Sequence, residues 1–368
     1  MEPLARNEKL SLVLVPVLSV SSFAVLYWLR QFDDNRLTSW HWVFEHVSFP
    51  PVFAALVLLA ALAVLASRYE LPSAKVLAAI AFIVGAAFWR VPEVILDSSR
   101  YFTQAKHLSE FGVLYFLREW GGAIEPWTDM PLVPFIYGIG FSVLGESRMA
   151  VQLITTSAFA GALWLTCVSA RELFDKDGEQ AIGPLAGAFL LSIPYLYSQV
   201  PLMLVDVPAM FFLVLGFFAF QRALKSGGWG NIAFASVAIF AMLISKYSQW
   251  MFASVYVLLF FLKLKDKPSL VARRGFTVLA GTFFLFSIFL LAYQDVVSAQ
   301  MELLVNYQRP GLRRWGESFL STFFFQINPI VTICASGSAF VAFRRKDPRW
   351  LVTAWLVLLV LVMRIERS

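Results

Sequence analysis

The chain has 368 residues and a formal net charge of +6; 59% of its residues are hydrophobic and only 15% are charged. Its mean hydropathy of +0.70 lies far outside the range of soluble domains. Apolar runs of roughly 18 to 22 residues recur along it, each long enough to cross a bilayer as a helix. These features exclude a soluble enzyme and a β-barrel, and no nucleic-acid-binding motif accompanies the positive charge.

The apolar runs predict an all-α integral membrane protein with about 11 transmembrane helices. The first run is long and lacks the cleavage site of a signal peptide, so we expect it to be retained. The expected helices cover residues 10–29, 49–67, 74–92, 149–170, 182–200, 205–222, 231–246, 249–263, 275–294, 326–343 and 349–364.

Residues 130–145 are apolar but short, and they contain two prolines and three glycines. Whether they cross the membrane decides the side of every later loop. If they do not cross and the N-terminus is cytoplasmic, the three most basic short loops, 221–231, 263–275 and 344–349, face the cytoplasm, as the positive-inside rule requires. We therefore expect 130–145 to be an interfacial or re-entrant segment on the outer face.

On this topology a long outer loop, 93–148, follows the third expected helix and begins near Asp97. Within 101–117, apolar residues recur at spacings of three and four, which predicts an amphipathic helix lying on the membrane surface. A second outer loop, 295–325, is rich in aromatic and basic residues. We expect both loops to contribute to an active site at the outer face.

An acid just past a membrane helix, a surface helix, a proline-leucine element and the segment 144–153 together resemble the polyprenyl-phosphate-sugar glycosyltransferases of the GT-C superfamily. This group includes the protein O-mannosyltransferases and the aminoarabinose transferases of lipid A. The matching motif residues are Asp97, Tyr101, Ala105 and Gly112, followed by the segments 129–145, 205–212 and 245–250. One departure is Ser98, where many relatives have a second acid.

The resemblance implies three regions. Residues 1–73 would form two extra N-terminal transmembrane helices, and 74–263 the conserved GT-C-like catalytic module. Residues 264–368 would add C-terminal transmembrane helices together with the outer loop 295–325.

Transfer of a sugar from a lipid phosphate requires a base for the acceptor and positive charge for the leaving phosphate. A carboxylate at the edge of an apolar cavity is partly desolvated and becomes a better base near neutral pH, and we predict this role for Asp97. Asp206 would position the acceptor or support Asp97. Inversion at the anomeric carbon in one displacement is implied by the family.

Lys246 ends an expected helix on the outer side and is the first candidate for binding the donor phosphate; Arg309, Arg313 and Arg314 are further candidates. The residues predicted to bind acceptor or sugar are Tyr101, Trp120 and Trp127. A divalent cation, Mg²⁺ or Mn²⁺, would be held by Glu125, Asp129 and His107, because hard cations prefer oxygen ligands.

Each role has an ordinary structural alternative. Asp97 could serve only as a helix cap, and Lys246 could simply extend to the membrane interface. Two other functions are a secondary transporter and a non-catalytic GT-C-like scaffold, which the serine at position 98 motivates. The expected partners are a polyprenyl-phosphate-linked sugar, a lipid, glycan or protein acceptor, and membrane lipids, at a bacterial or archaeal plasma membrane.

Overall fold

The computed structural model describes residues 73–89, 96–174, 182–191, 193–265, 267–308 and 329–346, with isolated positions at 20–57 and 351–355. The described chain is helical and has no β-strand, in agreement with the predicted all-α fold. The predicted helices 10–29, 49–67 and 349–364 lie outside the described residues, apart from those isolated positions.

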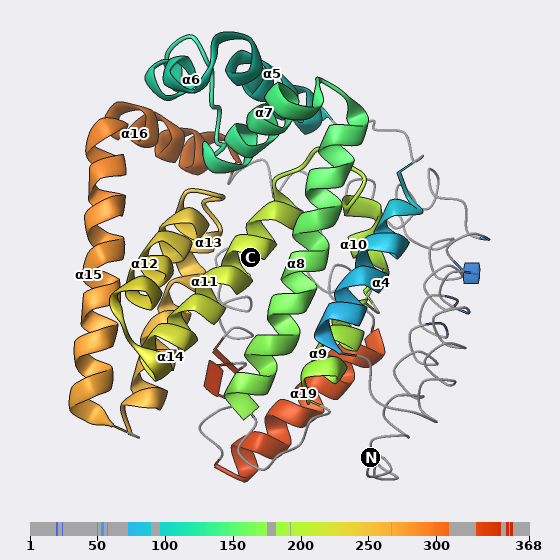
Figure 1. Ribbon diagram of the computed structural model, residues 1–368, viewed down its shortest axis with the longest axis vertical. Helices are drawn as coiled ribbons and strands as arrows, with labels where there is room; N and C mark the ends of the chain where they lie inside the picture. The colour runs from blue at the N-terminus through green and yellow to red at the C-terminus, as the bar shows by residue number, and fades with distance from the viewer. Residues whose placement is uncertain are drawn as a thin grey trace. The chain divides into compact units, whose positions relative to one another are not determined.

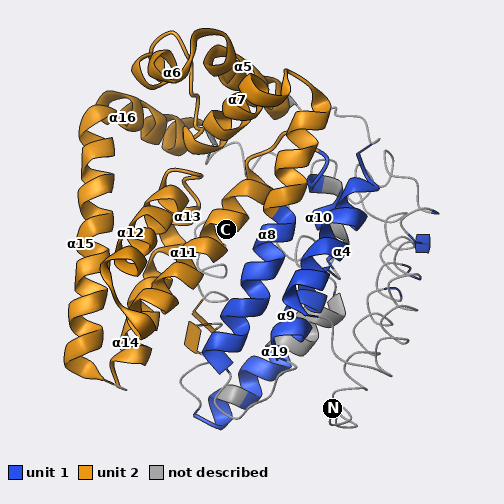
Figure 2. Cartoon of the chain, in the orientation of Figure 1, with its two compact units in different colours: residues 1–92, 159–201, 315–346 blue, residues 93–158, 202–314, 347–368 orange. Residues whose placement is uncertain are grey.

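The chain divides into two compact units (Figure 2). Unit 1 comprises residues 1–92, 159–201 and 315–346, and unit 2 comprises 93–158, 202–314 and 347–368. The helices of unit 1 are α4 (Ala74–Ala86), the second part of α8 (Arg148–Phe174), α9 (Ile182–Leu191), α10 (Pro194–Gln199) and α19 (Pro329–Arg344).

Unit 2 contains residues 93–148, predicted to be an outer loop, and most of the predicted catalytic module. Its elements are the first part of α8, α5 (Leu96–Phe111), α6 (Val113–Glu119), α7 (Leu132–Leu144), α11 (Asp206–Ser226), α12 (Trp229–Leu243), α13 (Gln249–Phe252), α14 (Ser254–Leu264), α15 (Pro268–Ala292), α16 (Gln294–Leu303) and a π-helical turn, η2 (Leu304–Gln308).

Three of the described helices, α8, α11 and α15, are long and apolar enough to cross a membrane. α11 and α15 extend beyond the predicted spans at their basic ends. Pro268 occupies the first turn of α15, where the missing amide hydrogen is not needed. Arg274 then donates from Nη1 to the carbonyl oxygens of Leu224 and Lys225 at the end of α11, at 2.9 and 2.8 Å. These contacts satisfy carbonyls that the helix itself leaves unpaired.

Two predicted helices are interrupted. The span predicted at 182–200 divides into α9 and α10, because Pro194 starts a new helix and restricts the backbone of the residue before it. The span predicted at 249–263 divides into α13 and α14 at Ala253. The prediction of a continuous helix was wrong in both places.

The surface helix predicted at 101–117 is two helices. α5 begins earlier, at Leu96, and ends at Phe111, and α6 follows after Gly112. Gly112 has φ +84°, a conformation that other residues rarely adopt. Helix α16 covers the start of the predicted outer loop 295–325 and buries Val297 and Gln300.

Within unit 2, α5, α6 and α7 lie at the end of α15 where α16 begins (Figure 1). An apolar cluster joins them there. Its buried members are Leu108, Phe116, Trp120, Ile124, Met130, Phe289 and Val297. The turn after α12 packs on this cluster through Ile244 and Tyr247. The polar residues of the outer loop therefore gather at one end of the unit 2 helices, whereas the loop contacts of Arg274 lie at the other.

Candidate functional site

One face of α5 carries the polar residues of the site. Arg100 and Tyr101 lie three and four positions after Asp97, and Gln104 lies four and three positions after them, so these side chains share one side of the helix. Tyr101 and Gln104 are buried, while Asp97 lies in the first turn and is half-exposed. The polar face of α5 therefore begins at the accessible carboxylate of Asp97 and continues to the buried side chains of Tyr101 and Gln104.

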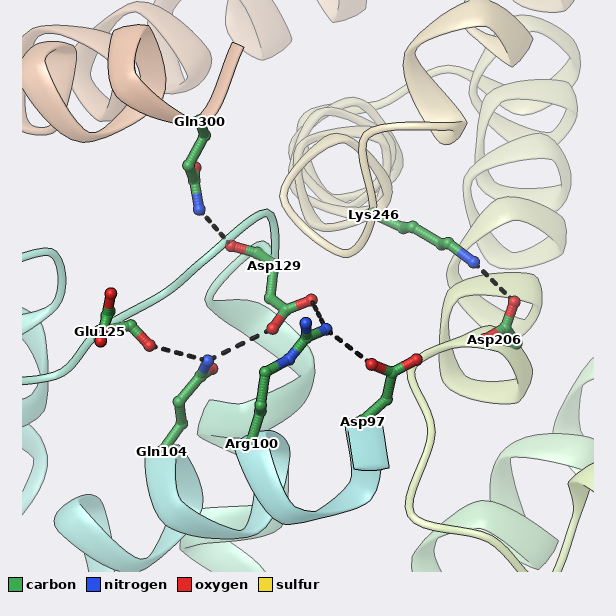
Figure 3. Close-up of polar contacts among 8 residues, drawn as sticks. All are labelled: Asp97, Arg100, Gln104, Glu125, Asp129, Asp206, Lys246 and Gln300. Atoms are coloured by element: carbon green, nitrogen blue, oxygen red, sulfur yellow. Dashed lines mark hydrogen bonds and ion pairs between the residues drawn. The ribbon is translucent and has the colours of Figure 1, made fainter. Parts of the chain in front are cut away.

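Arg100 bridges two carboxylates that are 32 positions apart in sequence (Figure 3). Its Nη2 lies 3.2 Å from Oδ1 of Asp97 and 3.3 Å from Oδ1 of Asp129. The two acids differ in environment, since the side chain of Asp97 is 51% exposed and that of Asp129 is 5% exposed. Arg100 therefore fixes the accessible carboxylate relative to a buried one.

Asp129 lies in the loop between α6 and α7 and is held on several sides. The amide nitrogen of Gln104 donates to its Oδ2 at 3.4 Å, and that of Gln300 donates to its backbone carbonyl at 2.8 Å. Burial raises the pKa of Asp129 to about 6, although the charge of Arg100 and a hydrogen bond from Tyr101 act in the opposite direction. Asp129 is thus the buried ion-pair partner of Arg100, and its pKa of about 6 lies close to neutral pH.

Tyr101 is 5% exposed, and its ring lies beneath the Arg100 guanidinium, whose central carbon is 5.7 Å from the ring centroid. Burial, followed by the negative charge of Asp129, raises the pKa of Tyr101. The tyrosine consequently stays neutral and can donate a hydrogen bond to Asp129. Its predicted part in sugar binding is not supported by this buried position.

A second charged pair lies on the Asp97 side of the site. Lys246, in the turn after α12, places Nζ 2.6 Å from Oδ1 of Asp206, the first residue of α11 (Figure 3). The backbone also connects this turn to the loop of Asp129, because the amide of Leu132 donates to the carbonyl of Ile244 at 3.2 Å. The two predicted residues Asp206 and Lys246 are thus brought together.

A pocket of about 330 Å³ opens beside α5. One wall comes from α5, and the other from the loop between α6 and α7. The lining residues include Arg100, Thr103, Gln104 and His107 of the helix and Glu125 and Trp127 of the loop. Trp127 is 45% exposed. Of the three residues predicted to bind acceptor or sugar, Trp127 alone presents an accessible ring.

Trp120 is 2% exposed and packs against Phe289 and Tyr293 in the apolar cluster. This position gives it no free ring face for a sugar, so its predicted role is not supported. Arg309, Arg313 and Arg314, predicted to bind the donor phosphate, lie outside the described residues.

The three residues predicted to hold a divalent cation occupy different surroundings. His107 and Glu125 line the pocket, whereas the carboxylate of Asp129 is engaged by Arg100 and Gln104. Among the described residues, no group of three His, Cys, Asp or Glu side chains could hold a metal ion. The residues in their present arrangement do not fit a metal site, and cation dependence stays a prediction.

Arg100, Gln104 and Gln300 were missed by sequence reasoning. A signal for the first two exists, because polar residues at positions 100 and 104 share the α5 face with Asp97 and Tyr101. Gln300 had no such signal, since its contact with Asp129 joins residues 171 positions apart.

Residues 125–292 match the family model of the dolichyl-phosphate-mannose-protein mannosyltransferases. The match extends from the pocket loop to the end of α15 and includes Asp129, Asp206 and Lys246, while Asp97 and Arg100 precede it. Over these residues the chain is similar to the GT-C glycosyltransferases. This confirms the resemblance seen in the sequence and supports a membrane glycosyltransferase. No curated protein and no solved structure matches this GT-C-like chain.

Proposed function

We propose that the protein transfers a sugar from a polyprenyl-phosphate donor to an acceptor on the extracytoplasmic face of the membrane. The observation that carries this proposal is that an accessible, oriented carboxylate, Asp97, and the Lys246–Asp206 pair lie at the same end of the unit 2 helices. A base and a cation are the two groups that such a transfer requires.

Asp97 would act as the general base. As the acceptor oxygen forms a bond to the anomeric carbon, its proton passes to the Asp97 carboxylate. The bond from that carbon to the phosphate oxygen breaks, and its electron pair leaves with the lipid phosphate. A single displacement of this kind inverts the anomeric centre. Arg100 would orient Asp97 without touching the reacting atoms.

Lys246 would bind the phosphate and stabilise the charge that develops on the leaving oxygen. Its ammonium group is held by Asp206, and both side chains remain partly exposed, at 35% and 52%. Asp206 would therefore orient Lys246. This is a more specific role than the acceptor positioning expected from the sequence.

The matched family supports the proposed donor class, because its description names dolichyl-phosphate mannose and a protein acceptor. A lipid-linked sugar would reach this site from the bilayer, and the acceptor would approach from the aqueous side. No step of the proposed reaction passes through a metal ion. Assays with and without EDTA test the predicted Mg²⁺ or Mn²⁺ separately.

The proposal is tested with the full chain in nanodiscs, supplied with tritiated dolichyl-phosphate mannose and a membrane-extract acceptor fraction. We expect label to appear on acceptor, and Asp97→Asn to reduce the rate by about 10² to 10⁴-fold, because an amide cannot take the proton. Asp295→Asn, which removes another exposed acid at the start of α16, is the control and should retain full activity.

Unchanged activity in Asp97→Asn would remove Asp97 from its role. Label that accumulates inside proteoliposomes without becoming attached to any acceptor would instead indicate a transporter.

A further inference from the structure

The pocket beside α5 is lined by three residues that each carry a buried polar atom to which the proposed chemistry assigns no role. The amide nitrogen of Gln104 donates to the carbonyl of Glu125 at 3.2 Å and to Asp129 at 3.4 Å. This fixes the orientation of the amide, and its oxygen, Oε1, is buried and has no hydrogen-bond partner among the described residues. Gln104 is itself 2% exposed and lines the pocket.

Two other residues of the pocket wall share this property. Nε of Arg100 and Nδ1 of His107 are buried and have no hydrogen-bond partner in the described part of the chain. Buried polar atoms of this kind cost free energy until something pairs with them. Three residues that line one cavity each carry such an atom, which indicates that the cavity is built to receive a polar ligand.

The unpaired atoms are of mixed character. Gln104 offers an acceptor, Arg100 offers a donor, and the imidazole nitrogen of His107 can be either. A hydroxyl group donates and accepts at once, so it complements such a set. The charge of Arg100 is already balanced by Asp97 and Asp129, which leaves no excess positive charge to attract a phosphate.

Trp127 adds an apolar wall to these polar groups. The residue has φ +49° and is 45% exposed, and the Arg100 guanidinium carbon lies 6.0 Å from its ring centroid. An accessible indole beside hydroxyl-pairing groups suits a sugar ring, which has apolar C–H faces and polar edges. A volume of about 330 Å³ is at the small end of ligand pockets and suits one sugar residue.

The position of the pocket relative to Asp97 indicates which sugar it would hold. Along α5 the pocket extends from Arg100 to His107, whereas the Lys246–Asp206 pair lies on the other side of Asp97 (Figure 3). In an inverting displacement the acceptor and the leaving phosphate lie on opposite sides of the anomeric carbon. With the phosphate near Lys246, the pocket is on the acceptor side.

We infer that this pocket is a subsite for a sugar residue of the acceptor, recognised by Gln104, Arg100 and His107 and stacked on Trp127. The acceptor is accordingly a glycan or glycolipid. The assignment of the sugar to the acceptor rests on the proposed function, whereas sugar binding in the pocket can be measured without any glycosyl transfer.

The binding test uses saturation-transfer NMR with the full chain in nanodiscs. The probes are methyl glycosides of mannose, glucose, galactose and N-acetylglucosamine. We expect saturation transfer from the native protein and from Asp97→Asn to at least one glycoside. Ala123→Trp, which fills the pocket from the loop between α6 and α7, should abolish it, and Trp127→Ala should weaken binding about tenfold. Leu114→Trp, on the exposed surface of α6, adds the same side chain elsewhere and should have no effect.

Absence of saturation transfer to every glycoside would overturn the sugar subsite, whether or not the protein is an active transferase. Saturation transfer to a serine- and threonine-containing peptide but to no glycoside would overturn the sugar subsite in favour of a peptide site, if Ala123→Trp removed that signal.

A second measurement separates acceptor from donor sugar. Hydrolysis of dolichyl-phosphate mannose, which releases mannose, is measured without acceptor. Transfer of mannose is measured with acceptor present. We expect Ala123→Trp to lower transfer and leave release unchanged. Loss of both would place the donor sugar in the pocket and contradict the inference. If the native protein shows neither reaction while glycosides still bind, the proposed function fails and the sugar pocket remains.

Discussion

Lys246 and Asp206 are 40 positions apart in the chain, yet Nζ of the lysine lies 2.6 Å from Oδ1 of the aspartate. Both side chains are more than a third exposed, so their attraction is screened by solvent and contributes little to folding stability. An exposed pair at the start of one membrane helix and just past the end of its neighbour is better placed to meet an anionic ligand than to stabilise the fold.

Lys246→Ala should chiefly impair use of the donor. Hydrogen bonds to charged groups contribute about 1.5 to 3 kcal/mol, which corresponds to a loss of about 10- to 150-fold in kcat/KM for the lipid-linked sugar. The measurement is initial transfer rate against concentration of dolichyl-phosphate mannose. Lys225→Ala removes the same charge at the opposite end of α11 and should behave as the native protein. Equal effects of the two substitutions would assign the lysines a general electrostatic role.

Asp129 should make stability depend on pH between about 4 and 6. Burial raises its pKa to about 6 in the folded chain from 3.8, so the folded state binds the proton more tightly than the unfolded state. The stabilisation is complete below the unfolded value and is lost as pH rises through the folded value. The difference in Tm between native protein and Asp129→Asn should therefore fall from pH 4 to pH 6 and then level off.

Thermal unfolding in detergent, followed by tryptophan fluorescence, measures this difference. Glu302→Gln, an exposed carboxylate on α16, is the matched control, and its difference from the native protein should stay constant. A difference for Asp129→Asn that rises through the same pH range would show that the ion pair with Arg100 outweighs burial.

The sequence predicted the class of fold and most helix positions, because hydropathy and helix length are local properties. It did not predict the break at Pro194, where proline divides a run of unbroken hydropathy, or the short helix α16. Residues 294–303 have too little apolar content for a membrane span, and their helix is stabilised by burying Val297 and Gln300. Such burial depends on partners distant in sequence and is not visible in a local pattern.

Asp97, Asp206, Lys246 and Asp129 were also found from sequence, but their pairings were not. The sequence linked Asp206 with Asp97 and assigned Asp129 to a cation. In the structure, Asp206 pairs with Lys246, and Asp129 pairs with Arg100. A basic residue one turn away from an acid on a helix is common on ordinary surfaces. The ion pair of Arg100 with Asp129 forms because the loop of Asp129 lies against α5, and no local sequence pattern shows that contact.

Arg100 and Asp129 should be energetically coupled. Arg100→Ala leaves a buried carboxylate without its cation, which costs about 1 to 3 kcal/mol. Asp129→Asn removes that charge, so Arg100→Ala/Asp129→Asn should be more stable than Arg100→Ala alone at pH 7.5. A double-mutant cycle of Tm values measures the coupling. Strictly additive effects of the two substitutions would mean that the two side chains do not interact in solution.

Gly138 should be required for the contact between α5 and α7. A methyl group there would lie 2.6 Å from Cβ of Leu108 and 2.8 Å from the carbonyl oxygen of Ala105. The backbone oxygen cannot move without shifting α5, so Gly138→Ala should destabilise the protein by about 1 to 3 kcal/mol. Gly230→Ala makes the same change in α12, where nothing lies within 4 Å, and alanine favours helix there. Its Tm should be unchanged or higher, whereas that of Gly138→Ala should be lower.

Because α5 carries Asp97 and the pocket wall, Gly138→Ala should also reduce transfer at temperatures where the protein remains folded.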